Sequence, residues 1–367
     1  PQWGSILKRV YVLVPLLFVL QSCMPMGETL DKNLSPFYRY GTGVDKNKVF
    51  YCATSLGSSP KEVKDIDIES FKVISRFWAK DKNAVYNITT RYTDVDIKSF
   101  VVKSINENSK YPENYLLSDK NHVYYLDASR PQDKMLTILG GADPATFVHW
   151  GLKGFNRWAK DKNHVYCYWK MFDADPASFE PVNTRFAKDK NFLYVGERDN
   201  IQTLKINTDK LVELGIYYVY VDDTVYFYDS TKNPLAVISD IKDTLSITIL
   251  YANRWLRADG RLYFNGHPYS DTSIDAANIH PVGYAYFYDK RNIYFCPFAG
   301  DKLTAVKHAD VATFEVLGKS YYAKDKNHAY YSGKVIDGAN PHYFYYDEND
   351  NYAYSGQNRY KDGKLKK

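Results

Sequence analysis

Residues 318–336 read Gly-Lys-Ser-Tyr-Tyr-Ala-Lys-Asp-Lys-Asn-His-Ala-Tyr-Tyr-Ser-Gly-Lys-Val-Ile, and this stretch decides the fold. Its apolar and aromatic residues predict short strands at residues 321–324 and 329–331. The polar Asp-Lys-Asn-His between them predicts a hairpin turn, because Asp and Asn accept hydrogen bonds from nearby backbone amides and Asn tolerates the left-handed conformation. Ser332 and Gly333 predict a second turn before another short strand. The stretch therefore predicts a small antiparallel meander.

The Asp-Lys-Asn motif of this turn recurs along the chain. Six copies are recognised by their turn residues: Asp45 and Asn47, Asp81 and Asn83, Asp119 and Asn121, Asp161 and Asn163, Asp189 and Asn191, and Asp325 and Asn327. Diverged copies begin at Asp222, Asp259, Asp289 and Asp347. The copies follow one another at intervals of roughly 34 residues, which is typical of repeat architectures whose units bury their apolar faces on neighbouring units.

A second motif, Ala-Asp-Pro-Ala-Thr-Phe at residues 142–147, recurs at residues 174–179, 309–314 and, more diverged, 67–71. Asp caps the free amides at the start of a helix, and Pro at the first helical position loses no hydrogen bond. The segment therefore predicts a connector of one helical turn, with a longer version at residues 208–214. We expect its Phe to pack in the apolar layer between neighbouring units.

Together the repeats predict an all-β fold of tandem hairpin or meander units joined by one-turn helical connectors. Irregular spacing favours an open, solenoid-like array, and a propeller-like arrangement is the alternative. The predicted organisation is a signal peptide at residues 1–22, a lipidated Cys and tether at 23–40, the repeat array at 41–356 and a basic tail at 357–367. The lysines of this tail predict solvated disorder.

The repeated Asp-Lys-Asn turn, followed by an apolar residue and tyrosines, resembles the DKNYY repeat family from about Asp45 to about Tyr354. The resemblance implies a bacterial envelope lipoprotein and, because some members lie near toxin systems, suggests an immunity role. Between Asp199 and His280 the chain departs from the pattern, so this stretch is a candidate for a specialised surface. Its candidate binding residues are Tyr217, Tyr218, Tyr220, Tyr226, Tyr228 and Trp255.

The N-terminus carries the features of a secretory signal. Lys8 and Arg9 precede an apolar run that is too short to span a membrane. Leu20, Gln21, Ser22 and Cys23 resemble a bacterial lipobox, which predicts that the Cys23 thiol is acylated and becomes the mature N-terminus. Several acyl chains give stable anchoring, at about 0.8 kcal/mol per buried methylene. Ordinary cleavage beside an unmodified Cys, or a retained anchor, are the alternatives.

The residue after Cys23 bears on the membrane in which the anchor lies. Met24 is not an acidic retention residue. By resemblance to Gram-negative lipoproteins, the expected location is the outer membrane, facing the periplasm or the cell surface.

The charge balance argues against nucleic acid as a partner. Without Lys8 and Arg9 the chain has 46 basic and 43 acidic residues, a net charge of +3. Tyrosine is the compositional outlier at 35 residues. Its ring packs on a pleated sheet while its hydroxyl reaches water, so most tyrosines are expected to be architectural. Exposed ones are candidates for binding sugar rings or proteins.

The remaining reactive residues form no recognisable site. Cys52, Cys167 and Cys296 allow at most one disulfide, and buried free thiols are the favoured interpretation. Histidines follow three of the turns, at His122, His164 and His328, but a repeated turn residue is more often simply exposed than a metal ligand. No calcium loop and no catalytic motif is present. We therefore expect no metal, no cofactor and no enzyme.

The sequence thus predicts a non-enzymatic, lipid-anchored envelope protein that binds another protein. An immunity protein that masks a periplasmic toxin is one form of this function. The alternative is a repeat protein that binds glycan or peptidoglycan.

Overall fold

The structure is a computed structural model that describes residues 26–52, 59–104, 115–152, 155–197, 200–229, 235–239, 241–250, 254–297 and 300–366. The predicted signal peptide, the predicted lipobox residues Leu20, Gln21 and Ser22, and the predicted lipidation site Cys23 lie outside these residues. Among the described residues no helix has the length and apolarity needed to cross a membrane.

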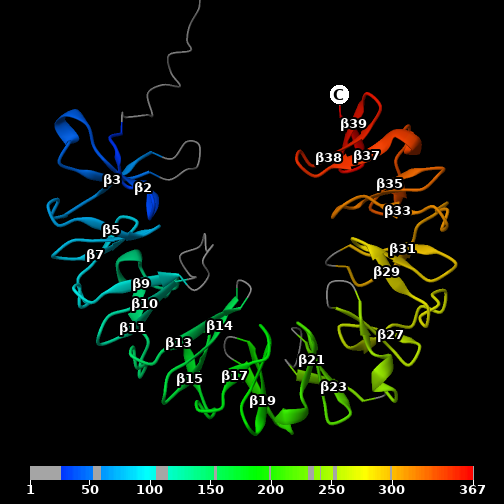
Figure 1. Cartoon of the computed structure of the whole chain (residues 1–367), viewed down its shortest axis with the longest axis horizontal. Helices are drawn as coiled ribbons and strands as arrows, with labels where there is room; N and C mark the ends of the chain where they lie inside the picture. Colours follow the sequence, from blue (N-terminus) through cyan, green and yellow to red (C-terminus); the bar gives the residue numbers. More distant parts are fainter. Residues whose placement is uncertain are drawn as a thin grey trace, which may run out of the picture. The chain divides into compact units, whose positions relative to one another are not determined.

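The chain forms two compact units, residues 1–176 and residues 177–367. In the parts that the structure describes, the first unit contains four sheets and the second contains six (Figure 1). Each sheet has four strands, and each strand pairs antiparallel with the next strand of the chain. No described sheet closes into a barrel, and no α-helix occurs among the described residues. The predicted all-β array of tandem meanders is confirmed.

We name the sheets A to J in chain order. Sheet A contains β1 (Thr29–Asp31), β2 (Ser35–Tyr40), β3 (Val49–Tyr51) and β4 (Lys61–Val63). Sheet B contains β5 (Lys72–Ser75), β6 (Trp78–Lys80), β7 (Val85–Asn87) and β8 (Thr90–Tyr92). Sheet C contains β9 (Val101–Ser104), β10 (Tyr115–Ser118), β11 (Val123–Leu126) and β12 (Leu136–Ile138). Sheet D contains β13 (Val148–Leu152), β14 (Phe155–Lys160), β15 (Val165–Cys167) and β16 (Lys170–Phe172).

The second unit begins with sheet E, made of β17 (Glu180–Pro181), β18 (Phe186–Lys188), β19 (Phe192–Glu197) and β20 (Asn200–Lys205). Sheet F contains β21 (Val212–Gly215), β22 (Tyr218–Val221), β23 (Thr224–Tyr228) and β24 (Leu235–Ile238). Sheet G contains β25 (Thr248–Ile249), β26 (Trp255–Ala258), β27 (Arg261–Phe264) and β28 (His267–Pro268).

Sheet H contains β29 (His280–Gly283), β30 (Tyr286–Tyr288), β31 (Ile293–Phe295) and β32 (Thr304–Ala305). Sheet I contains β33 (Glu315–Val316), β34 (Tyr322–Lys324), β35 (Ala329–Tyr331) and β36 (Lys334–Val335). Sheet J contains β37 (Phe344–Asp347), β38 (Tyr352–Ser355), β39 (Asn358–Lys361) and β40 (Lys364–Lys366).

Sheet I shows how the opening stretch of sequence folds. The Asp-Lys-Asn turn joins its second and third strands, β34 and β35, as predicted. Ser332 and Gly333 then form a two-residue turn with φ of 50° and 75°, and β36 pairs with β35. The connectors are also single turns: in residues 142–147 the Thr146 N–H donates to the Asp143 carbonyl, and residues 208–210 form a short 3-10 helix.

The prediction that the connector Phe packs between neighbouring repeats is confirmed. Phe71, in the connector before sheet B, packs 6.2 Å from the Tyr38 ring of sheet A and 5.5 Å from the Tyr86 ring of sheet B. Phe314 lies between Tyr286 of sheet H and Tyr330 of sheet I in the same way. Such ring pairs contribute about 0.5–1.5 kcal/mol beyond their buried area. An aromatic layer therefore joins sheet A to sheet B and sheet H to sheet I.

The predicted ends of the array were wrong. Residues 29–40, expected to be tether, form β1 and β2 of sheet A, and residues 358–366, expected to be a disordered basic tail, form β39 and β40 of sheet J. The physical reason is alternation: Tyr360 is 2 % exposed and packs on Phe344, whereas the basic residues beside it face solvent. The diverged motif copy at Asp347 also differs from the others, because its turn joins the first two strands of its sheet rather than the second and third.

Candidate binding cleft

The aspartate of most repeat turns is a buried acceptor rather than an exposed turn residue. In sheet C, one carboxylate oxygen of Asp119 accepts hydrogen bonds from the N–H groups of Asn121 (2.7 Å) and His122 (2.8 Å). The other oxygen accepts from the Tyr124 hydroxyl (2.6 Å) and from the N–H of Asp96 in the preceding connector (2.8 Å). Asp119 is only 4 % exposed. We call this carboxylate with its four donors the aspartate node.

The node recurs at Asp81, Asp161 and Asp325, and at the diverged Asp289. The lysine of the motif pairs with the connector aspartate, as in Lys82 with Asp67 at 2.6 Å. The same pair forms from Lys120, Lys162 and Lys326 to Asp96, Asp143 and Asp310. The two sequence motifs therefore interact as a single structural element.

The Asn of the motif does not adopt the conformation expected of it. None of the six Asn residues, from Asn47 to Asn327, is among the described residues with positive φ, and all six side chains are exposed. The turn uses the Asn backbone N–H instead, with Asp as the acceptor. Asp45 also departs from the node, because it is half-buried and pairs with Lys48 at 2.8 Å.

The nodes have no catalytic character. Burial raises the pKa of the Asp119 carboxyl, but the hydrogen bonds from Tyr124 and from backbone amides outweigh it, so the pKa lies below its ordinary value. Burial and the bond to Asp119 raise the pKa of Tyr124. Four donors occupy the lone pairs of an ionised carboxylate, so it cannot accept a proton from a substrate without losing its structure.

Two further contacts join several of the sheets to the next sheet of the same unit. The lysine before the motif reaches the following connector: Lys80 Nζ donates to the carbonyls of Ile97 (2.8 Å) and Phe100 (3.1 Å), and Lys324 Nζ donates to that of Phe344 (3.1 Å). An aromatic residue two positions earlier reaches the third turn of the next sheet. Tyr286 shows this, because its hydroxyl accepts from the Gly333 N–H at 3.1 Å.

The predicted aromatic binding surface is largely buried. Tyr218, Tyr228 and Trp255 are 0 %, 3 % and 1 % exposed, so the expectation that they are exposed was wrong. Tyr218 occupies the position that reaches the next sheet, and its hydroxyl donates to the Arg254 carbonyl at 2.7 Å. Tyr217, Tyr220 and Tyr226 are half-buried.

The cysteines and histidines form no shared site in the described part of the chain. Cys167 and Cys296 are buried, Cys52 is half-buried, and no disulfide joins any two of the three. His122, His164 and His328 each lie beside the aspartate of their own turn, at 3.9, 3.7 and 4.0 Å. No group of His, Cys, Asp or Glu able to hold a metal occurs among the described residues.

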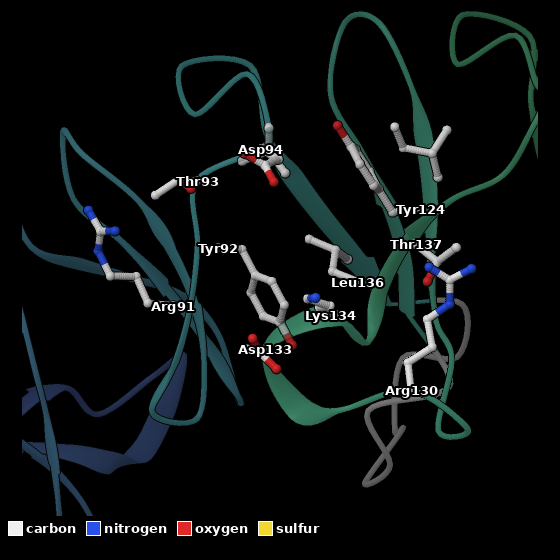
Figure 2. A pocket seen from close by; sticks show the side chains of 12 residues that line it. Arg91, Tyr92, Thr93, Asp94, Tyr124, Arg130, Asp133, Lys134, Leu136 and Thr137 are labelled. Atoms are coloured by element: carbon white, nitrogen blue, oxygen red, sulfur yellow. The ribbon is translucent and has the colours of Figure 1, made fainter.

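An open cleft of about 500 Å³ lies between sheets B and C (Figure 2). Its cause is an enlarged third turn in sheet C. In sheets B, D, G, I and J this turn has two residues between its strands, but in sheet C residues 127–135 separate β11 from β12 and include a 3-10 turn, Gln132–Lys134. The longest interval between motif copies, 42 residues from Asp119 to Asp161, contains this insertion. That interval is the sequence signal from which the cleft could have been expected.

Charged groups of both signs line the cleft. Arg91 and Asp94 come from β8 and the loop after it, and Arg130, Asp133 and Lys134 come from the enlarged turn. In Figure 2, Arg91 and Arg130 stand on opposite sides, with Asp133 and Lys134 between them.

The ring of Tyr92 lies in the middle of the cleft. Its hydroxyl donates to the Gln132 carbonyl at 2.9 Å, which fastens the enlarged turn to sheet B. Burial, together with the nearby Asp133 carboxylate, raises the pKa of Tyr92 to about 12, so its hydroxyl stays protonated and available as a donor.

Beside the enlarged turn, Trp78 lacks the contact that the corresponding residue of sheet A makes with its neighbouring sheet. It occupies the position of Tyr38, whose hydroxyl donates to the carbonyls of Phe77 and Ile88 in the next sheet. The Trp78 ring is fully buried, and its Nε1 has no hydrogen-bond partner among the described residues. The regular contact between neighbouring sheets is therefore interrupted where the cleft opens.

The DKNYY family model matches residues 43–232 and 286–367 of the chain. The interval without a match, residues 233–285, contains sheet G and overlaps the end of the stretch that the sequence marked as diverged. Sheet G nevertheless keeps the repeat fold, and Asp259 accepts from the N–H groups of Lys242 (2.6 Å) and Asp243 (2.9 Å). No curated protein and no solved structure matches the chain.

Proposed function

The chain belongs to the DKNYY family, and from this premise we propose that it is a non-enzymatic protein that binds a protein partner at the bacterial envelope. The cleft between sheets B and C carries the proposal. Small-molecule sites are usually enclosed and mostly apolar, whereas this cleft is open, and cations, carboxylates and threonines line it together with apolar and aromatic residues. A segment of another protein supplies complementary charges and backbone amides together.

The arrangement favours a protein over a glycan. Binding of sugar rings along the array requires evenly repeated, exposed aromatic faces. The aromatic residues at the repeated strand position are instead buried between sheets, as in Trp78, Tyr218 and Tyr286, each 0 % exposed. Third turns longer than two residues also separate the last two strands of sheets A, F and H, so the charged lining of the cleft, rather than the enlarged turn itself, is what favours a protein partner.

Acylation of Cys23 would hold the protein at the membrane, and occlusion of a periplasmic toxin is the specific role that we propose. A preformed surface needs no conformational change to cover an active site, because its ordering is complete before binding. In cells, Cys23→Ser is expected to move the protein from the membrane fraction to the periplasmic fraction and to abolish labelling by palmitate. Palmitate labelling of Cys23→Ser would contradict the anchor.

A photo-crosslinking amino acid tests the cleft directly. At Thr137, which lines the cleft, it is expected to capture one protein in cells, and the paired changes Arg91→Glu and Lys134→Glu should reduce that product about tenfold, as loss of charge complementarity does at interfaces. The same amino acid at the exposed Thr203 of β20 is the matched control. Capture of glycan fragments alone at Thr137, or equal capture at Thr203, would contradict the proposal.

A further inference from the structure

We propose that one face of sheet J binds an acidic segment of a protein, at a site separate from the cleft. Strand register assembles this face in two rows. Tyr345 pairs with Tyr354, Tyr354 with Arg359, and Arg359 with Lys366. Residues directly opposite one another across a sheet lie on the same face, so these four side chains form a continuous row. The second row consists of Asp347, Tyr352, Lys361 and Lys364, two positions along each strand.

The opposite face of sheet J is the one that packs on sheet I. Phe344, Ala353 and Tyr360 are 1 %, 0 % and 2 % exposed and share an apolar cluster with Tyr322 of β34. The two rows therefore point away from sheet I. No described segment covers them: Tyr345 is 53 % exposed, and Arg359 and Lys366 are exposed as well.

Comparison with sheet I indicates that this is a packing face. Tyr352 takes the place of Tyr322, which is 3 % exposed and whose hydroxyl donates to the Tyr360 carbonyl of sheet J. Tyr354 takes the place of Lys324, whose Nζ reaches the connector before sheet J. Sheet J therefore has an aromatic residue, Tyr352, at the position that contacts the next sheet elsewhere in the array. It has a second tyrosine, Tyr354, at the position of the lysine.

The charge of the face selects an acidic occupant. Arg359, Lys361, Lys364 and Lys366 contribute four cations. Two carboxylates accompany them, Asp347 in the second row and Asp350 beside Tyr354, so cations outnumber carboxylates on this face by four to two. Like charges across an interface are repulsive, so the same face of a second copy is a poor occupant.

The rings favour a protein segment over a sugar. Tyr345 and Tyr354 are stacked on each other, with centroids 5.3 Å apart and planes 18° apart. The Tyr352 ring is covered by the Arg359 guanidinium at 4.4 Å and by Lys361 Nζ at 4.6 Å. Sugar rings need a free aromatic face, whereas tyrosine and arginine beside one another are typical of protein-binding hot spots.

Fluorescence anisotropy of a labelled polyglutamate peptide with the full chain tests the proposal. We expect saturable binding that weakens about tenfold in the Arg359→Glu, Lys361→Glu variant. Binding should also weaken several-fold in the Tyr345→Ala, Tyr354→Ala variant at the same ionic strength, because ring contacts are lost without a change of charge. The Lys205→Glu, Lys210→Glu variant, equally charged and distant in sequence, is the matched control and should bind like the unaltered chain.

Three outcomes would overturn the proposal. Binding that does not depend on the tyrosines would reduce it to diffuse charge attraction, and equal weakening in the control variant would remove the site from sheet J. Tyrosine-dependent binding of polygalacturonate or of phosphatidylglycerol vesicles as tight as that of polyglutamate would assign the face to another class of ligand. The cleft variant Arg91→Glu, Lys134→Glu should bind polyglutamate normally, so failure here and failure of the cleft are separable.

Discussion

A buried carboxylate with four donors explains why the repeat motif has its spacing. Asp at the first position accepts from the backbone two and three residues later and from the Tyr hydroxyl five residues later, as Asp325 does with Tyr330 at 2.7 Å. The connector N–H of Asp310 completes the set at 2.7 Å. The lysine holds the connector from outside. Nothing in the structure explains why the exposed third residue is Asn in all six regular copies.

Asp119→Ala should destabilise the protein strongly. It leaves the Tyr124 hydroxyl and several amides without an acceptor, each costing about 1–3 kcal/mol, so a loss of about 3–5 kcal/mol is expected from urea unfolding of sheet C. Tyr124→Phe removes one donor and should cost about 1 kcal/mol. Asn121→Ala is the matched control, because its exposed side chain makes no contact in the node, and should change stability by under about 0.5 kcal/mol. Equal losses in Asp119→Ala and Asn121→Ala would contradict the node.

The nodes also predict sensitivity to acid. The pKa values of Asp119, Asp161 and Asp325 lie below their ordinary value, and the salt bridge from Lys82 lowers the pKa of Asp67 to about 2. A carboxyl with a lowered folded-state pKa stabilises the fold above its unfolded pKa, near 4, and loses that contribution as pH falls through the folded value. The thermal midpoint should therefore be steady above about pH 5 and fall between about pH 4 and pH 2. A midpoint that is unchanged at pH 2.5 would contradict this origin of stability.

At the scale of elements, the connectors and turns could be predicted from the sequence, but the hydrogen bonds between a connector and the following turn could not. Strand alternation and turn chemistry are local, so the meander of residues 318–336 is readable from sequence. The node is not, because Asp67 donates to Asp81 across 14 residues from a separate motif. Tyrosine packs well both between sheets and on a solvent-exposed surface, so the residue type alone did not reveal that Tyr218 is buried. The extra residues of the enlarged turn in sheet C are visible in the sequence. That they open a cleft could not be predicted, because this depends on the three-dimensional contacts of Trp78.

Replacing residues 127–135 by Ser-Gly tests whether the enlarged turn is dispensable for folding. Leu126 and Leu136 already face each other across the sheet, as Tyr331 and Lys334 do in sheet I, so the shorter turn has a suitable frame. The shorter loop costs less entropy, but the Tyr92 hydroxyl loses its Gln132 acceptor at a cost of about 1–3 kcal/mol, so stability should fall by roughly 1 kcal/mol or stay unchanged in urea unfolding. Crosslinking from Thr137 should disappear. A variant that fails to fold, as judged by circular dichroism, would show that the turn is structural and would contradict this division of roles.

At the scale of the whole molecule, each unit is a row of sheets, and the contacts described above join neighbouring sheets of the same unit. In the second unit, Tyr286 joins sheet H to sheet I through the Tyr321 carbonyl, and Tyr322 joins sheet I to sheet J through the Tyr360 carbonyl. Stability in such arrays is approximately a sum of the stability of each repeat and the coupling to its neighbours. A local defect should therefore spread over a few sheets rather than unfold a whole unit at once.

Asp325→Ala tests whether a local defect spreads only to neighbouring sheets, because Asp325 lies in sheet I, between sheets H and J. Amide hydrogen exchange should accelerate most in sheet I and to a smaller extent in sheets H and J, since losing the node loosens the strands that carry Tyr322 and accept from Tyr286. Sheet E, several sheets away in the same unit, should keep its protection. Asn327→Ala, in the same turn but with an exposed side chain, should leave every sheet unchanged. Uniform acceleration from sheet E to sheet J would instead mean that the unit unfolds as one cooperative body, and the nearest-neighbour description would be wrong.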